Sequence, residues 1–254
     1  MNSTHAAVIL LSLLSFVTTC LGVALALKLR ENPRAIAAGI GFSAGIMLLI
    51  STLELIPEAN AAMSPVATAG GVSAGAALVW LAHFVIPHTH LVKERGRMDA
   101  ALIRSAYLVA LGLILHDIPE GFAMANAYVA SPELGVLVAL GIALHNLPEE
   151  FVMAVPAVML KSRSFLFGAA LLSALAEPLG AIIGLVAVGI APGLNAQFLA
   201  FAAGAMIFVS VHELIPMAKR YHHGGSFVFG AGLSFLVYLL LASVTVGQIA
   251  QNRF

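Results

Sequence analysis

Long apolar runs separated by short polar breaks dominate the pattern of this chain. A helix needs roughly 20 apolar residues to cross the hydrocarbon of a bilayer, and breaks at proline, glycine and charged residues cut the sequence into eight such runs. The predicted spans are 6–27, 35–57, 66–86, 103–127, 134–158, 164–190, 195–217 and 227–249. The sequence has no alternating ten-residue segments of the β-barrel kind, so the pattern predicts an all-α integral membrane protein. We expect residues 1–254 to form a single transmembrane domain.

The composition agrees with a membrane protein. Hydrophobic residues make up 61% of the chain and charged residues 9%, whereas soluble domains carry about 25% charged residues. Lys and Arg together number 12, as do Asp and Glu, so the net charge indicates neither a nucleic acid nor an acidic partner. The single cysteine, Cys20, excludes an intrachain disulfide and a thiolate cluster, which leaves histidine and carboxylates as possible metal ligands. The first run follows MNSTH without a basic segment and is long enough to span, so we interpret it as a membrane helix rather than a cleaved signal.

The basic residues predict the orientation of the spans. Every second loop is basic, and these loops hold 11 of the 12 Lys and Arg residues, whereas residues 58–65, 128–133 and 191–195 contain none. Because Lys and Arg gather in cytoplasmic loops, this alternation supports eight spans with both termini outside.

Two internal repeats relate the halves of the chain. FSAGIMLLISTLELIPEA (42–59) and FAAGAMIFVSVHELIPMA (201–218) agree at 10 of 18 positions. LGLILHDIPEGFAMA (111–125) and LGIALHNLPEEFVMA (140–154) agree at 9 of 15. The members of each pair are separated by an odd number of crossings, so the copies are inverted. Spans 1–3 are then mirrored by spans 6–8, with spans 4 and 5 mirrored between them, a plan common in secondary transporters.

The central repeat carries the motif His-x-x-Pro-Glu twice, in consecutive spans. A His and a Glu four residues apart lie on one helical face, as two ligands of one ion require. The proline frees a backbone carbonyl beside them, which is tolerated at a hydrated cavity or an ion. The candidate ligands from the two motifs are His116, Glu120, His145 and Glu149.

Further polar residues lie at the same depth. Asp117 and Asn146 follow the two histidines and are candidates for a second position that shares the same two glutamates. Glu177, before Pro178 in span 6, is another carboxylate, and Glu150 is either a third ligand or an acid turned toward another helix. Together, spans 4 to 6 hold five acidic residues near mid-depth and no basic partner. A charge at the bilayer centre costs about 2.5–3.5 kcal/mol, so a bound dication or protonation is needed as compensation. Histidine and carboxylate ligands suit Zn²⁺, Fe²⁺, Mn²⁺, Co²⁺ or Cd²⁺.

The outer repeat predicts an entrance and an exit. Glu54 falls near the outer end of span 2, and His212 and Glu213 fall near the cytoplasmic end of span 7. We expect Glu54 to form the entrance and the other two the exit. Four loop histidines are either cytoplasmic receiving ligands or ordinary solvated residues: His88, His90, His222 and His223.

The motifs HDIPEG, HNLPEE and AEPLG in three consecutive spans resemble those of the ZIP family of divalent metal transporters, and the chain is most similar to short bacterial members. The resemblance implies one metal position from His116, Glu120, His145 and Glu149. It implies a second from Asp117, Asn146, Glu177 and the two shared glutamates. It also implies uptake of metal as a substrate toward the cytoplasm, a homodimer and a bacterial inner membrane. The chain differs from the common family pattern at Asp117 and Glu150, and both differences add negative charge.

Two other functions use the same residues. A metal-dependent intramembrane hydrolase would let bound Zn²⁺ activate water with a glutamate as the base, but the sequence has no H-E-x-x-H or G-x-S-x-G motif. A metal-selective channel differs from a carrier in rate rather than in ligands. Inverted copies of the ligands favour a carrier, so we expect a transporter without a catalytic cofactor rather than an enzyme.

Overall fold

The computed structural model describes residues 3–29, 32–85, 116–159 and 163–251 of the chain, and these residues contain helices and turns but no β-strand. The fold prediction of an all-α protein is confirmed for this part of the chain. The elements in chain order are α1 (Ser3–Ser12), α2 (Leu14–Leu29), α3 (Pro33–Ile50), η1 (Ser51–Leu55), α4 (Ile56–Ala62), α5 (Pro65–Val85), a helix over 116–130, α7 (Pro132–Met159), α8 (Arg163–Ile190), η3 (Pro192–Leu194), α9 (Asn195–Val209), η4 (Ser210–Leu214), α10 (Ile215–Lys219) and α11 (Gly224–Gln251).

Seven helical stretches in the described residues are long and apolar enough to cross a membrane. They correspond to seven of the eight predicted spans, and the predicted 134–158 and 164–190 match α7 and α8 closely. The remaining span, 103–127, lies outside the described residues as far as residue 115, and its described part is helical. The chain is thus a multi-pass membrane protein. Span 1 contains an interruption that hydropathy did not predict, because α1 ends at Ser12 and α2 begins at Leu14.

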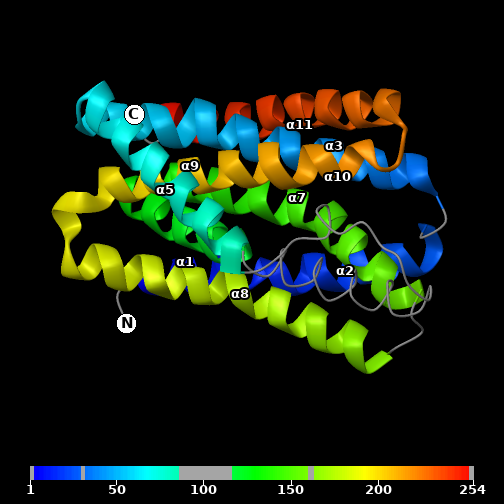
Figure 1. Ribbon diagram of the computed structural model, residues 1–254. Helices are drawn as coiled ribbons and strands as arrows, with labels where there is room; N and C mark the ends of the chain where they lie inside the picture. The colour runs from blue at the N-terminus through cyan, green and yellow to red at the C-terminus, as the bar shows by residue number, and fades with distance from the viewer. Residues whose placement is uncertain (1–2, 30–31, 86–115, 160–162, 252–254) are drawn as a thin grey trace.

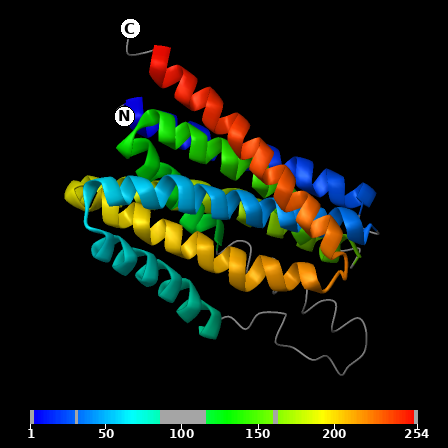
Figure 2. The same ribbon diagram turned by 90° about the horizontal axis from the view of Figure 1, so that it is seen from above.

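The helices form a bundle with long helices lying side by side (Figure 1). One group packs α3 against α11 and α5 against α9, and another packs α2 against α7 and α8. The contact between α3 and α7 joins the two groups. Figure 2 shows α11 crossing obliquely over the bundle and α5 lying at its edge. Helix α7 therefore lies between the two groups and is well placed to hold a buried site.

The outer surface of the bundle is apolar. Large side chains such as Phe167, Ile190, Val228 and Leu240 are more than 60% exposed, as expected where the solvent is lipid. Polar side chains are instead found inside, and several in α2, α7, α8 and the helix over 116–130 are buried. The bundle thus has an apolar outer surface and an apolar core that encloses a group of buried polar side chains.

Helices α3 and α9 each end in a short π-helical segment at the same place in the repeat. The backbone N–H of Ile56 donates to the carbonyl of Ser51, and that of Ile215 donates to Ser210, both five residues back. Each of these serines also donates its hydroxyl to the carbonyl four residues earlier, at 2.7 Å for Ser51 and 2.9 Å for Ser210. π-Helical segments are rare and occur often at functional sites. The sequence did not predict them.

Candidate metal centre

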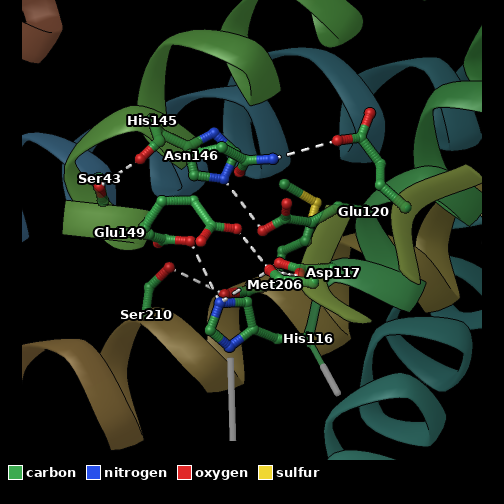
Figure 3. A network of polar contacts seen from close by, with 12 residues as sticks. Ser43, His116, Asp117, Glu120, His145, Asn146, Glu149, Met206 and Ser210 are labelled. Carbon is green, nitrogen blue, oxygen red and sulfur yellow. Dashed lines mark hydrogen bonds and ion pairs between the residues drawn. The ribbon is translucent and has the colours of Figure 1, made fainter. Parts of the chain in front are cut away.

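Two histidines and two glutamates exchange partners between the helix over 116–130 and α7. The Nε2 atom of His116 lies 3.1 Å from Oε2 of Glu149, and the Nε2 atom of His145 lies 3.0 Å from Oε1 of Glu120. Figure 3 shows the four side chains turned toward one another across the two helices. The histidine of each His-x-x-Pro-Glu motif therefore pairs with the glutamate of the other motif.

The four side chains are buried, since none is more than 4% exposed. His116, Glu120 and Glu149 each offer one ligand atom, and these three atoms lie within 4.8 Å of one another. The edge of a tetrahedron with metal–ligand bonds of roughly 2.0–2.1 Å is about 3.3 Å long. The two His–Glu separations are within a few tenths of an ångström of that edge. His116, Glu120 and Glu149 are therefore the three residues best grouped to hold an ion such as Zn²⁺, and His145 adjoins them through Glu120.

The orientation of His145 is set by its other ring nitrogen. Nδ1 lies 2.9 Å from the carbonyl oxygen of Gly141, which can only accept, so Nδ1 donates its proton there. In the neutral ring, Nε2 then carries a lone pair that faces a carboxylate oxygen of Glu120. These two hydrogen-bond acceptors, Nε2 of His145 and Oε1 of Glu120, lie 3.0 Å apart and require a positive charge between them, which is either a proton or a shared cation. A ligating histidine commonly donates its second N–H to a backbone carbonyl, and His145 has this arrangement.

The other predicted ligands form two hydrogen-bonded sets beside this cluster. The amide of Asn146 donates to Oε2 of Glu177 at 3.1 Å, which links α7 to α8. The hydroxyl of Ser173 lies 2.6 Å from Oδ2 of Asp117 and 2.5 Å from Oε1 of Glu150. All seven candidate ligands of the sequence prediction therefore lie buried at the contact of three helices.

Small residues bring α8 close enough for Glu177 to reach the centre. A Cβ atom at Gly121 would overlap the carbonyl oxygen of Glu177, and one at Gly180 would overlap that of Ile118. Glycine permits this close approach of two backbones, as small residues commonly do between membrane helices. Both glycines are thus required for the position of α8 beside the site.

Sequence reasoning missed three polar residues near the centre. Ser173 contacts both Asp117 and Glu150, and Thr19 donates to Oε1 of Glu150 at 3.0 Å. Ser43 donates to the carbonyl of His145 at 2.8 Å. A helical spacing signal was present for two of them, because Ser173 precedes Glu177 by four residues and Thr19 continues a polar row with Ser12 and Ser15.

The residues of the predicted entrance and exit lie in the π-helical segments η1 and η4. Glu54 is half-buried and accepts a hydrogen bond of 2.5 Å from the hydroxyl of Tyr238 on α11. Glu213 is half-buried, and His212 is exposed and stacks on Phe208 with ring centroids 4.8 Å apart. The loop histidines His88 and His90 lie outside the described residues.

A cavity of about 280 Å³ opens where α4 ends and α9 begins. Glu58 is the charged residue in its lining, and Asn195 and Gln197 add polar groups. Glu58 follows Glu54 by one helical turn, so both acids lie at the same end of span 2.

The chain is similar to known proteins over most of its length. The family described as ZIP Zinc transporter matches residues 87–244. A protein named Zinc transporter ZupT from Chlorobium luteolum is 38% identical over 267 residues, covering 94% of this chain and 98% of the relative. Proteins of the same name from Corynebacterium aurimucosum and Escherichia fergusonii are 37% and 36% identical, covering 91% and 94% of this chain and 94% and 98% of the relatives.

The chain belongs to the ZIP family of zinc transporters. The resemblance drawn from the motifs is thereby confirmed. Membership also confirms the predicted class, which is a transporter and not an enzyme.

Proposed function

We propose that this protein carries Zn²⁺, and related divalent ions such as Fe²⁺, Mn²⁺, Co²⁺ and Cd²⁺, across the bacterial inner membrane toward the cytoplasm. The observation that carries the proposal is the reciprocal pairing of His116 with Glu149 and of His145 with Glu120. In this proposal the metal is the transported substrate, and residues 1–254 form one transmembrane domain. Relatives named zinc transporters support Zn²⁺ as the main substrate.

Charge balance supports a cation at this place. Residues 105–160 contain no Lys or Arg, yet Asp117, Glu120, Glu149 and Glu150 are at most 5% exposed. A single charge near the bilayer centre costs about 2.5–3.5 kcal/mol on insertion scales. A dication held between the carboxylates removes most of that cost, and it also supplies the positive charge that the pair of His145 and Glu120 requires.

A second metal position beside the first completes the proposed site. Asp117, Asn146 and Glu177 surround it together with the shared Glu120 and Glu149. The link between Asn146 and Glu177 and the burial of all five residues support this position. Two adjacent ions that share carboxylates repel each other, so the arrival of one would loosen the other during transport.

An inverted repeat accounts for how such a site would face each side of the membrane in turn. Three matched features support it: the reciprocal His–Glu pairs, the two π-helical segments, and the packing of α3 on α11 beside that of α9 on α5. In this plan both termini face outside. Glu54 lies at the entrance, and His212 with Glu213 lies at the exit. We also propose a homodimer, as the family resemblance implies.

Zinc flux into proteoliposomes tests the proposal. A carrier gives an initial rate that saturates at micromolar Zn²⁺, and Glu120→Ala reduces it to the background of empty liposomes. A current that rises linearly without saturation would instead indicate a channel. Metal-dependent hydrolysis of lipid or peptide without any zinc movement would favour the hydrolase.

The entrance and exit are tested separately from the centre. Glu54→Ala and Glu213→Ala are expected to change the concentration for half-maximal uptake or the maximal rate while zinc binding at the centre persists. If neither variant altered the kinetics of uptake, this assignment of the two ends would be wrong.

A further inference from the structure

One buried cluster beside the proposed metal positions contains two residues, Glu150 and Ser173, that the proposed function does not use. Glu150 lies on α7 next to Glu149 but turns to α2 and α8, where its Oε1 atom contacts Thr19 and Ser173. Ser173 also contacts Asp117. An enclosed space lies among Asp117, Asn146, Glu149, Glu150 and Ser173, and it has no room for a whole water molecule.

The hydrogen bonds of this cluster cannot all be satisfied by its own protons. Ser173 has one hydroxyl proton but lies 2.6 Å from Oδ2 of Asp117 and 2.5 Å from Oε1 of Glu150. Ionised carboxylates only accept, so one of these two contacts has no hydrogen between its oxygens. An added positive charge is needed here, as it is between His145 and Glu120.

Three oxygen atoms that line the space have no hydrogen-bond partner within the described part of the chain. They are Oδ1 of Asn146, Oε1 of Glu149 and Oε2 of Glu150. Each belongs to a side chain that is at least 95% buried. A buried acceptor without a partner costs about 1–3 kcal/mol, and more when it is charged. Three such atoms around one space therefore indicate a ligand that can bind them all.

We propose that Asp117, Glu149, Glu150 and Ser173 form an all-oxygen position for a hard divalent cation, with Mn²⁺ the best match, on the Glu150 side of the His/Glu centre. The hydroxyl oxygen of Ser173 already lies 2.6 Å from a carboxylate oxygen of Asp117 and 2.5 Å from one of Glu150. Octahedral coordination with bonds of roughly 2.1 Å gives edges of about 3.0 Å, so the cluster needs little expansion to hold an ion.

The chemistry of the ligands selects among metals. Carboxylate, amide and hydroxyl oxygens suit Mg²⁺, Ca²⁺ and Mn²⁺, whereas the imidazoles of the neighbouring centre suit Zn²⁺. The space excludes water, and Mg²⁺ gives up its water reluctantly. Ca²⁺ takes its oxygens at roughly 2.3–2.6 Å, which spaces them more widely than the 2.5–2.6 Å separations of the Ser173 contacts. Mn²⁺ remains. Glu150 would thus extend the substrate range of the transporter toward harder ions, and this inference rests on the proposed function.

The test compares the affinities of the purified full-length protein in lipid nanodiscs for Mn²⁺ and for Zn²⁺, each measured by equilibrium dialysis with elemental analysis. Glu150→Gln keeps the shape of the side chain and removes its charge. We expect it to weaken Mn²⁺ binding at least about tenfold more than Zn²⁺ binding. Glu133→Gln, which removes an acid from the first turn of the same helix, is the control and should change neither affinity.

A second variant keeps the test decisive if Glu150→Gln does not fold. Ser173→Ala removes a ligand oxygen without changing the charge, and we expect it to weaken Mn²⁺ about threefold more than Zn²⁺. Unchanged Mn²⁺ affinity in these variants would overturn the inference, since Glu150 would then hold a proton or only join helices. An equal loss of both metals would also overturn it.

Failure of the proposed function has a different result. If His145→Ala left Zn²⁺ affinity unchanged, or if no metal crossed the membrane, the transport proposal would fail whatever happened at Glu150. If zinc flux and the His145→Ala effect were as expected and only the Mn²⁺ selectivity were insensitive to Glu150→Gln, the transporter would stand and this site alone would be rejected.

Discussion

The two pairs of helices related by the internal repeats differ in where proline lies relative to the acidic residue. In the central pair, formed by the helix over 116–130 and α7, proline precedes the acid directly and both helices remain α-helical through it. In the flanking pair, which joins α3 to α4 and α9 to α10, proline follows the acid by three residues and the intervening turn is π-helical. The two pairs therefore differ both in the position of proline and in the type of helix around the acid.

The burial of the acids differs in the same way. Glu120 and Glu149 are at most 4% exposed and face histidines, whereas Glu54 and Glu213 are half-buried. Buried acids without a basic partner need a cation, while half-buried acids can keep water. The comparison supports the proposal that the central pair binds the ion and that the flanking pair meets it on the way in or out.

The largest expected effect comes from removing a shared carboxylate of the central pair. Glu149→Ala deletes the partner of His116 and, in the proposal, a ligand of both metal positions. We expect zinc flux into proteoliposomes to fall to background while the protein stays monodisperse in detergent. Glu133→Gln on the same helix is the matched control and should transport normally. Flux above one tenth of the wild-type rate in Glu149→Ala would contradict a shared ligand.

A smaller loss is expected from either histidine of the centre. His145→Ala should weaken Zn²⁺ binding by roughly 10- to 100-fold, because it removes one ligand and leaves Glu120 without its partner. His116→Ala should cost a similar factor if the central pair is symmetric. His5→Ala, on the exposed face of α1, is the control. Isothermal titration calorimetry measures the Zn²⁺ affinity of all three variants. Strongly unequal losses of affinity at the two histidines would show that the two motifs, although similar in sequence, contribute unequally to binding.

The packing that holds α8 beside the central pair is tested by glycine substitution. Gly180→Ala places a methyl group against the carbonyl of Ile118, and overpacking of this kind typically costs about 1–3 kcal/mol. We expect a lower melting temperature together with weaker zinc binding, because Glu177 moves with α8. Gly168→Ala on the same helix meets nothing within 4 Å and should be neutral or slightly stabilising. If the two variants melted alike, close approach at Gly180 would not matter.

Hydropathy and motif spacing predicted much of this architecture. Seven spans were placed correctly because apolar length is a direct consequence of bilayer thickness. The buried cluster was predicted because His and Glu at a spacing of four must share a helical face. The reciprocal exchange of partners between the helices was not predicted, since it depends on how the two helices are rotated against each other.

Other features depend on hydrogen-bond register, which apolar length does not encode. The interruption at Leu13 and the π-helical segments at Ser51 and Ser210 are of this kind. Ser173 and Thr19 were missed because serine and threonine in a membrane span usually bond to their own helix, and only three-dimensional packing shows that these two reach Glu150.

The smallest effect concerns the flanking pair, where Tyr238 donates to Glu54. Tyr238→Phe removes the hydroxyl alone, and we expect it to lower the free energy of unfolding by about 1 kcal/mol, a usual net value for one hydrogen bond. Glu54→Gln and the double variant complete a cycle whose coupling energy isolates the pair. Tyr128→Phe, at a tyrosine with no hydroxyl bond in the described residues, should cost less. A coupling near zero would mean that Glu54 is free to meet the ion. A coupling of about 1 kcal/mol would mean that an arriving ion has to displace Tyr238 first, which makes this contact a step in entry rather than a fixed brace.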